Sequence, residues 1–408
     1  MKKQHLAAVD AQPQQWAEHL NTYINLVQGQ GYAIVSIQNQ VYWIKRFLAW
    51  LRSHAELHLN DLGIQRFLQS LRNAHLTRTG TAAALYRFLQ MLREQDVVPP
   101  KKEPPLSEQQ RLTKDYERYL LEERGLVPAT VAYNVRFADQ FVSVLHTKVE
   151  KPRFNFSQLR AEDVTDFVRR QSHKLSPGRA QLLCTGLRSF LRFLLHQGKI
   201  RTDLAVCVPT VARWSFSTLP KFLPASTVET VLARNDQRSP IGRRDYAILL
   251  LLARLGLRAC EVASLNLEDI DWENARINIR AKGGRWNQLP LPGDVGDALA
   301  SYLRHGRPRC SYRRVFVRNR PPLAGFTSPA AICGVVKHAL RRAGVESARK
   351  GAHLFRHSLA TSMLQQGASL DEIGELLRHR SPNTTTIYAK VDLPALRPLA
   401  LPWPGGAR

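Results

Sequence analysis

The chain has 408 residues and an ordinary apolar fraction of 44 %, which is enough for two or three domains that each bury a core. Lysine and arginine number 59 against 33 aspartate and glutamate, a formal charge of +26. Such an excess indicates a polyanionic partner such as nucleic acid, although basic side chains can also simply solvate helix faces. The longest apolar run, Ala247–Ala253, is far shorter than the roughly 20 residues of a membrane span, and the N-terminus lacks a signal-peptide apolar region.

The cysteines of the chain fit a protein of the reducing cytoplasm. The five cysteines are scattered and have no Cys-x-x-Cys spacing, which argues against both a disulfide framework and a zinc site. We therefore expect a cytoplasmic protein with no membrane association, no bound metal and no cofactor.

Two proline-rich stretches, 98–105 and 209–224, are candidate linkers because proline blocks helix continuation. They predict helical domains at 1–97 and 106–208, a third domain at 224–395 and a C-terminal tail at 396–408.

The first two domains resemble each other in sequence. Gly31 and Phe47 match Gly125 and Phe141 at an offset of 94, and further on Leu85, Phe88 and Leu89 run parallel to Phe190, Phe193 and Leu194. Each region is expected to be a four-helix bundle. A duplication would explain the parallel, but two unrelated amphipathic bundles could also match in this way.

The third domain mixes helix and strand. The segment from Ala247 to Leu255 predicts a buried helix, while 275–280 and 288–291, separated by a Lys282-Gly283-Gly284 turn, predict a β-hairpin. The expected fold is therefore mainly α, with helical bundles followed by an α+β domain that holds a small antiparallel sheet.

Residues near the C-terminus form a chemically suggestive series. His353-Leu354-Phe355-Arg356-His357 opens a predicted helix, at whose N-terminal end the dipole and free amides favour an anion such as phosphate. Gly367 ends that helix, and Ser369 with Glu372 predicts a capping box for the next. His379 follows, and Ser381-Pro382 starts a third short helix with Tyr388 near its end.

Six pieces of sequence in this order resemble the catalytic set of the tyrosine recombinase (integrase) family: Gly256-Leu257-Arg258 with Glu261, Lys282, His353, Arg356, His379 and Tyr388. The resemblance covers 224–392. It implies a catalytic domain there, a DNA-binding domain at 106–208 and an additional unit at 1–97. Two positions depart from the family pattern: Arg378 stands where glycine is usual, and Leu255 where threonine is frequent.

A phosphodiester is a repelling anion with a poor leaving group, so an enzyme that uses no metal must supply positive charge and protons from side chains. Arg258 and Arg356 suit the nonbridging oxygens, since arginine keeps its charge and offers a fork of donors. His379 would add a further donor. The resemblance implies Lys282 as general acid and Tyr388 as nucleophile in a 3′-phosphotyrosyl intermediate, with His353 as base or orienting partner.

Glu261 is expected to be a structural partner of an active-site base, and His357 a packing or hydrogen-bonding histidine. Arg188, Arg285 and Arg378 are candidate DNA contacts, and Arg378 could instead perturb His379. The expected partners are double-stranded DNA and further copies of the chain, as a dimer on one site and a tetramer in the synaptic complex. The apolar, proline-rich segment 393–403 is expected to dock on a neighbouring subunit.

Two other functions remain open at this point. One is an inactive DNA-binding accessory protein with the same fold. The other is a metal-dependent nuclease that uses His353, His357 and His379 as ligands, although no Asp or Glu lies within the His-x-x-Arg-His run to complete a usual site. The doubled helical region favours a recombinase or transposase of a mobile element.

Overall fold

The computed structural model describes residues 13–54, 57–76, 78–101, 105–147, 155–211, 219–280, 286–391 and 396–399. The chain divides into two compact units, of which one holds Met1–Pro100 with Thr218–Arg408 and the other Lys101–Ser217. Three main hydrophobic cores fall within 16–98, 116–208 and 223–355. The division into separate domains at 1–97, 106–208 and 224–395 stays a prediction.

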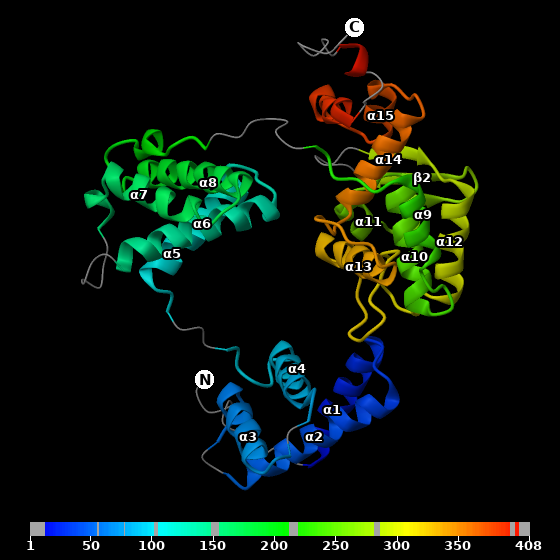
Figure 1. The fold of residues 1–408 in the computed structure, drawn as a ribbon. Coiled ribbons are helices and arrows are strands. Elements are labelled where there is room, and N and C mark those ends of the chain that lie inside the picture. The colour runs from blue at the N-terminus through cyan, green and yellow to red at the C-terminus, as the bar shows by residue number, and fades with distance from the viewer. Residues whose placement is uncertain are drawn as a thin grey trace. The chain divides into compact units, whose positions relative to one another are not determined.

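The first region is built from four α-helices (Figure 1): α1 (Pro13–Gly29), α2 (Ile34–Arg52), α3 (Asp61–Asn73) and α4 (Thr81–Glu94). Their apolar faces meet in one core, where Tyr23, Phe47, Phe67 and Phe88 are fully or almost fully buried. Asn60 caps α3 by accepting a hydrogen bond from the Gly63 amide at 2.9 Å. The predicted four-helix architecture is confirmed for this region.

The second region repeats this plan with additional short turns: α5 (Glu108–Arg118), the π-helix η1 (Tyr119–Glu123), α6 (Pro128–Thr147), η2 (Phe156–Gln158), α7 (Ala161–Ser172), α8 (Pro177–His196) and η3 (Leu204–Cys207). In the first region the ring of Tyr23 packs on Phe88, and in the second Tyr116 packs on Phe193. Phe88 and Phe193 are separated by 105 residues, the same offset that relates Leu85 to Phe190. The phenylalanines of the two ring pairs therefore agree with the sequence similarity of the two regions. The four helices expected here are also present.

The third region contains α9 (Ala225–Ala233), α10 (Pro240–Arg254), α11 (Ala259–Ser264), η4 (Leu267–Asp269), β1 (Ile270–Asp271), β2 (Arg276–Arg280), β3 (Trp286–Pro290), α12 (Gly293–His305) and α13 (Pro329–Arg342). It continues with α14 (His353–Gln365), α15 (Leu370–Leu376), η5 (Pro382–Thr384) and η6 (Thr386–Val391), and η7 (Arg397–Leu399) follows. The strands form an antiparallel sheet in the order β1-β2-β3. The mainly α fold with a small antiparallel sheet is therefore confirmed.

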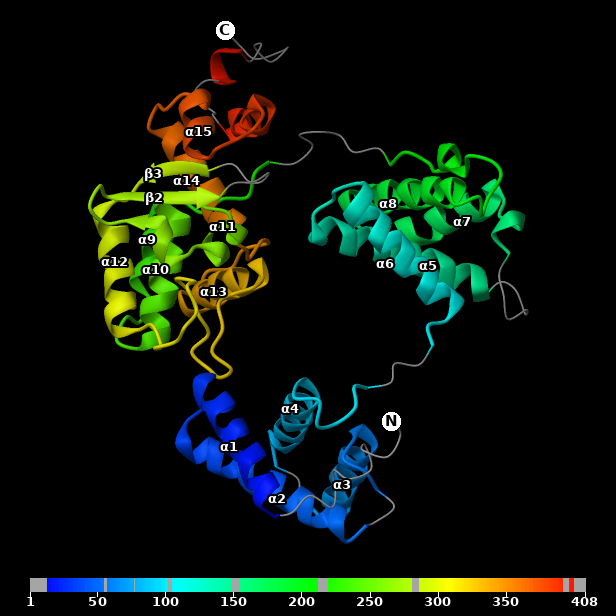
Figure 2. The ribbon, with the colours of Figure 1, turned by 180° about the vertical axis from the view of Figure 1, so that it is seen from behind.

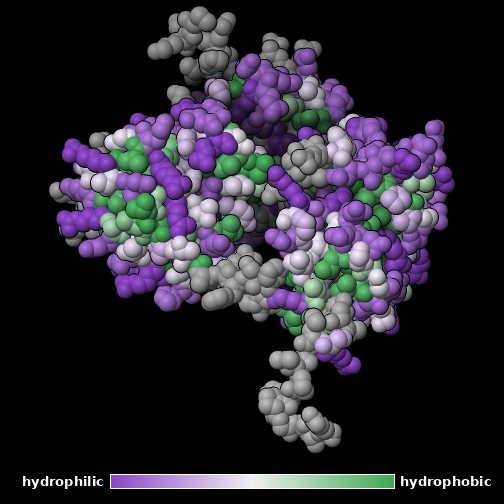
Figure 3. Space-filling view, turned by 90° about the horizontal axis from the view of Figure 1, so that it is seen from above, coloured by the Kyte–Doolittle hydropathy of each residue, from purple (hydrophilic) through white to green (hydrophobic). Residues whose placement is uncertain are grey.

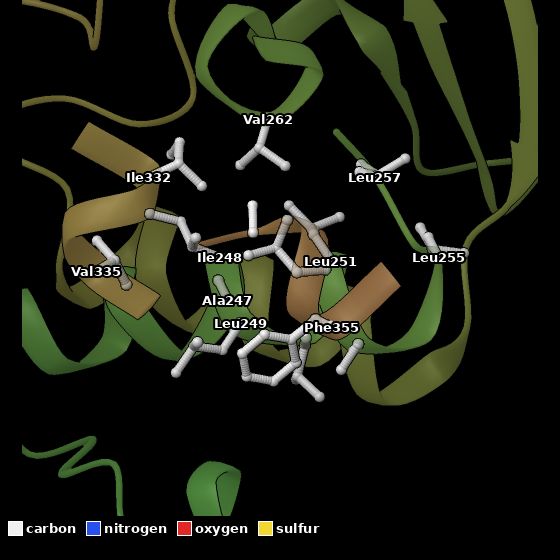
Figure 4. Close-up of a cluster of buried hydrophobic side chains, with 14 of the residues drawn as sticks. Ala247, Ile248, Leu249, Leu251, Leu255, Leu257, Val262, Ile332, Val335 and Phe355 are labelled. Carbon is white, nitrogen blue, oxygen red and sulfur yellow. The ribbon is translucent and has the colours of Figure 1, made fainter. Parts of the chain in front are cut away.

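Helix α10 lies at the centre of the third region's core. Every residue from Ala247 to Ala253 is buried, which is why this stretch of sequence is apolar on all sides. Figure 4 shows Ile248, Leu249 and Leu251 of α10 gathered with Val262 of α11 and Phe355 of α14. The predicted buried helix is thus correct, and it provides the support on which the helices carrying the chemical residues pack.

The surface agrees with the charged composition. On the face drawn in Figure 3, hydrophilic side chains predominate and apolar ones form small separate groups. Among the described helices, none combines the length and the apolar character needed to cross a bilayer.

Candidate active site

Helix α14 joins two hydrophobic clusters. Leu354 and Phe355, at its start, belong to the main core of the third region, whereas Ala360 belongs to a small second cluster with Ile373, Leu377 and Tyr388. Both ribbon views show α14 extending from the main body of this region toward α15 (Figures 1 and 2). Arg356 and His357 come between these two sets of apolar residues, so a single helical turn holds both of them at the junction of the clusters.

Arg356 is 3 % exposed and is held by backbone carbonyls. Its Nη1 donates to the Gly256 carbonyl at 2.5 Å, and its Nη2 donates to the Leu377 carbonyl. Burial and the positive charges of Arg258 and Arg378 lower the pKa of Arg356 to about 10. The guanidinium therefore remains charged at neutral pH and fixes the turn after α10 against the end of α15.

Gly256 is required at that turn. Its φ is +55°, and a Cβ there would lie 2.7 Å from Leu377 Cδ2 and 3.1 Å from Leu359 Cδ2. Only glycine combines the left-handed backbone with this close approach. The turn brings the next arginine, Arg258, to the start of α11.

Arg258 and Arg378 share one buried carboxylate, Glu261. Arg258 donates to Glu261 through its amide (2.8 Å to Oε2) and its guanidinium (2.8 Å to Oε1), and Arg378 donates to Oε2 at 2.9 Å. Burial alone would raise the pKa of Glu261, but the charge of Arg378 and the hydrogen bonds from Arg258 outweigh it, so the pKa is lowered. Glu261 is an ionised structural partner, as the sequence predicted, although its partners are arginines rather than a base.

With Arg356 included, the cluster sets three arginines against one carboxylate, which leaves an excess of positive charge beside a water-poor interior. A phosphodiester carries the complementary charge, and arginine donors fixed in advance are suited to the charge that develops on its oxygens during displacement.

Arg378 adopts a conformation that is uncommon for a residue with a side chain. Its φ is +55°, in the left-handed region that glycine occupies freely. This backbone accounts for the glycine that the family resemblance leads one to expect at the position. The Arg378 side chain is 6 % exposed and points to Glu261, so its charge serves the cluster. Direct contact with DNA by Arg378 stays a prediction.

Tyr388 lies on η6 with 1 % exposure. Its hydroxyl lies 3.0 Å from His357 Nδ1, and its ring stacks at 6.5 Å on that of His379. Burial raises the pKa of Tyr388 to about 12, while burial and the neighbouring charges of His353 and Arg349 lower the pKa of His357 to about 4. At neutral pH the phenol therefore carries its proton, and a neutral His357 with its proton on Nε2 can accept the hydrogen bond.

His379 connects the end of α15 to the segment that carries Tyr388. Its Nδ1 lies 2.8 Å from the hydroxyl of Thr385, which is 3 % exposed. Burial and the charges of Arg356 and Arg258 lower the pKa of His379 to about 4, so this ring is also neutral near pH 7. A neutral imidazole bonded at Nδ1 has Nε2 left to donate to an anion, if Thr385 donates and Nδ1 accepts.

Comparison with known proteins places this geometry in a family. The model of the phage integrase family matches residues 221–393. An integrase/recombinase of Sinorhizobium fredii, y4rA, is 44 % identical over 386 residues, which cover 93 % of this chain and 92 % of that one. The tyrosine recombinase XerD of Listeria monocytogenes serovar 1/2a is 32 % identical over 285 residues, 69 % of this chain and 94 % of XerD. The chain belongs to the tyrosine recombinase (phage integrase) family. It is a recombinase, an enzyme of site-specific DNA recombination.

Solved structures agree on the fold of the recombinase. XerH, bound to its palindromic difH substrate after cleavage, gives a TM-score of 0.56 at 19 % identity and covers 83 % of this chain and 94 % of XerH. A lambda integrase dimer bound to a COC′ core site gives a TM-score of 0.52 at 15 % identity, covering 68 % and 94 %.

Most of the residues predicted from sequence lie in two clusters. One contains Arg258, Arg356, Arg378 and Glu261, and the other contains His379 and Tyr388; helix α14 contributes a residue to each, Arg356 to the first and His357 to the second. Lys282 and Arg285 lie outside the described residues, between β2 and β3. Arg188 lies on α8 and donates to the carbonyls of Val208 and Pro209 at 2.9 and 3.2 Å. Its contact with DNA stays a prediction.

The tyrosine's partner in the recombinase is His357. The sequence assigned the role of base or orienting partner to His353, yet the structure gives the hydrogen bond with Tyr388 to His357, while His353 has an exposed ring 6.1 Å from that of His357. Partial loss of water and the charges of Arg356 and Arg258 lower the pKa of His353. Its assigned role stays a prediction. The sequence predicted a packing or hydrogen-bonding role for His357 and did not name Tyr388 as its partner; the only signal was its place directly after Arg356.

Thr385 was not predicted at all. Its only sequence signal is its position three residues before Tyr388, from which its hydroxyl can reach His379. Within the described ranges no group of three or more His, Cys, Asp or Glu side chains is arranged to hold a metal ion.

Proposed function

We propose that the recombinase cuts and rejoins double-stranded DNA by transesterification, with Tyr388 as the nucleophile. The hydroxyl of Tyr388, buried and 3.0 Å from neutral His357, is the observation that carries this proposal. A buried tyrosine next to a hydrogen-bond acceptor and an arginine cluster has what an attack on phosphorus needs: a proton acceptor and positive charge for the phosphate.

The pKa values of Tyr388 and His357 constrain the stage at which the phenol loses its proton. The pKa of Tyr388 is about 12 and that of His357 is about 4. Complete transfer before DNA binds would therefore cost on the order of 10 kcal/mol. The proton leaves the phenol during the attack, when the bond to phosphorus takes up the developing charge. His357 orients the hydroxyl and receives the proton at that stage.

The chemical step then balances as follows. The Tyr388 oxygen forms a bond to phosphorus, the bond from phosphorus to the 5′ oxygen breaks, and the departing oxygen takes a proton, which family resemblance assigns to Lys282. Arg258, Arg356 and His379 stabilise the nonbridging oxygens. The phosphotyrosyl ester keeps the energy of the broken bond, so a 5′ hydroxyl of another strand reverses the step without ATP and without a metal ion.

The partner is double-stranded DNA, held also by the helical regions 1–97 and 106–208. The net charge of +26 supports a polyanionic partner. XerH has been solved bound to a palindromic substrate, and lambda integrase as a dimer bound to a core site. By analogy the recombinase acts as a dimer on one site and as a tetramer when two sites are joined. Segment 393–403, proposed to dock on a neighbouring subunit, lies outside the described residues except for 396–399.

The test uses a nicked DNA substrate from which the short 5′-hydroxyl fragment diffuses away after cleavage, with a chelator present throughout. The proposal predicts a denaturant-resistant adduct, and mass spectrometry of its peptides should locate the 3′ phosphate on Tyr388. Binding without any adduct would favour the inactive accessory protein. Cleavage that needs a divalent ion and leaves no adduct would favour the nuclease.

A further inference from the structure

Helix α4 begins later than its counterpart in the second helical region. At the offset of 105 that relates Leu85 to Phe190, Thr81 corresponds to Gly186. Helix α8 begins at Pro177, well before Gly186, whereas α4 begins at Thr81 itself. The first region therefore has no helical turns over the face that α8 covers with its N-terminal half.

The shorter helix leaves an open cleft of about 590 Å³ in the first region. Its walls are α2, the turn at 78–80 and the first turns of α4, which lies beside α2. In the second region the backbone at the matching position lies close to α6: a Cβ on Gly186 would lie 2.9 Å from the Asn134 side chain, and Asn134 is the counterpart of Gln40. In the first region Thr81 takes the place of this glycine and lines the cleft.

Arginine supplies the charge of the cleft. The half-buried Arg87 guanidinium donates to Tyr32 Oη at 2.7 Å and to Gln40 Oε1 at 2.9 Å, and it lies 4.9 Å above the Tyr32 ring. Arg78 lines the rim. Within the described ranges no aspartate or glutamate lines the cleft and no carboxylate pairs with Arg87. A partly buried cation without a carboxylate favours an anion from outside.

Two further kinds of donor lie at the start of α4. Thr81 is 4 % exposed and lines the cleft, and its hydroxyl, which is itself buried from solvent, has no hydrogen-bond partner among the described residues. It also begins a helix of 14 residues whose N-cap is Gly80, so no N-cap side chain accepts from the first amides; the Thr81 amide donates to the Arg78 carbonyl at 3.3 Å, and the amides of Ala82 and Ala83 follow it. The first amides of an α-helix have no acceptor within the helix, and the dipole there favours negative charge. A ligand with several negatively charged oxygens can accept hydrogen bonds from both kinds of donor, the Thr81 hydroxyl and the amides at this helix end.

We propose that this cleft binds a phosphate group of the DNA backbone, in contact with Arg78, Arg87, Thr81 and the first amides of α4. The inference rests on the proposed function, because that function makes DNA the partner. It assigns to the additional helical region a defined phosphate contact at the start of α4.

Two substitutions in the full-length recombinase test the cleft without disturbing the fold. Arg78→Gln removes one charge from an exposed side chain, and Thr81→Val removes a hydroxyl that has no partner. The matched control is Arg52→Gln, an exposed arginine at the far end of α2. The measurement is the affinity for a duplex carrying the cleavage site, over a range of salt concentrations.

Each lost phosphate contact lowers the slope of log affinity against log salt by about 1. Arg78→Gln should lower it by that amount and weaken binding about tenfold at low salt. Thr81→Val, which changes no charge, should weaken binding two- to fivefold with the slope unchanged, and Arg52→Gln should change neither. Equal losses in Arg78→Gln and Arg52→Gln, or unchanged affinity in both cleft variants, would overturn the proposal.

Two other measurements distinguish a DNA phosphate from free phosphate as the ligand, and failure of the cleft proposal from failure of the proposed function. If inorganic phosphate raises the melting temperature of the wild type but not of Thr81→Val, while DNA binding is the same in both, the site takes free phosphate and the proposal is wrong. Adduct formation at saturating DNA should be normal in the cleft variants. If the wild type forms no adduct, the proposed function is wrong. The salt dependence of DNA affinity in the cleft variants would still test whether the cleft binds a phosphate.

Discussion

The two halves of the active site are held in different ways. The arginine half is anchored by Arg356 on two backbone carbonyls and by the buried Glu261, next to the large core around α10. The tyrosine half rests on a small cluster in which only Ala360, Ile373, Leu377 and Tyr388 are buried, and Tyr388 sits on a short 3₁₀ helix.

This difference indicates that the arginine half of the site is rigid and that the tyrosine half can move. Donors that stabilise a transition state work best when they do not have to rearrange, which suits the arginine half. A segment with few buried apolar contacts opens at low free-energy cost, so the tyrosine half is the part that can adjust when DNA arrives. We therefore expect substitutions in the arginine half to affect both stability and chemistry, and those in the tyrosine half to affect chemistry with little change in stability.

The largest effect is expected from Arg356→Lys. Lysine keeps the charge but cannot reach both the Gly256 and Leu377 carbonyls and the phosphate with one ammonium group. Single-turnover cleavage should fall about 10³-fold, and the free energy of unfolding should fall by about 1 to 3 kcal/mol because buried carbonyls lose their donors. Arg341→Lys, an exposed arginine of α13, is the control. A normal cleavage rate in Arg356→Lys would show that the fork geometry is unimportant.

Glu261→Gln comes next. It leaves the buried charges of Arg258 and Arg378 without their carboxylate, and breaking such a buried pair costs about 3 to 5 kcal/mol. Arg378→Gly should cost less, since glycine relieves the left-handed backbone, worth about 1 kcal/mol. Denaturant unfolding of the two variants compares them directly. If Arg378→Gly is the more damaging of the two, the Arg378 side chain stabilises the fold through more than its bond to Glu261.

His357→Leu sharpens the assignment in the tyrosine half. Loss of the acceptor at 3.0 Å from Tyr388 should slow single-turnover adduct formation about 10²-fold, with the midpoint of unfolding and the affinity for DNA nearly unchanged. His353→Leu should have a smaller effect, since its ring is exposed. The reverse order of the two rate losses would return the role of base or orienting partner to His353.

The smallest expected effect is on the pH dependence of stability. The pKa values of His357 and His379 are about 4 in the folded chain, below the value of about 6.5 in the unfolded chain. Between these values the unfolded chain binds more protons, so the free energy of unfolding falls as the pH decreases from about 7 to about 4.

Replacing His357 by Gln removes one such group and should make the decrease in stability over this range shallower than in the wild type, as measured by urea unfolding at several pH values. Parallel curves for the two proteins would mean that His357 does not lose protons on folding.

Much of this arrangement is encoded locally and could be predicted. Ser369 and Glu372 form the expected capping box, and the hairpin formed by β2 and β3 follows the alternating pattern of 275–280. Order and spacing along the chain singled out Arg258, Arg356, His379 and Tyr388, which the structure places in two adjoining clusters. The partners were harder to predict, because contacts such as that of Arg378 with Glu261, 117 residues apart, depend on how α11 and α15 pack.

Three irregular features of the structure could not be predicted from the sequence. The π-helix at Tyr119–Glu123 and the two-residue strand β1 have no periodicity long enough to read. The left-handed Arg378 was visible only as a departure from a family glycine, and the burial of its side chain required the structure.

The role of Tyr388 as nucleophile is tested most directly by comparing Tyr388→Phe with Tyr302→Phe. Both tyrosines are buried, and the hydroxyl of Tyr302 accepts from the Val317 amide at 3.4 Å, away from the arginine cluster. With the nicked substrate and a chelator, the wild type and Tyr302→Phe should accumulate the covalent protein–DNA adduct, while Tyr388→Phe should bind the same DNA with similar affinity and form none. An adduct that persists in Tyr388→Phe would place the nucleophile elsewhere and contradict the account.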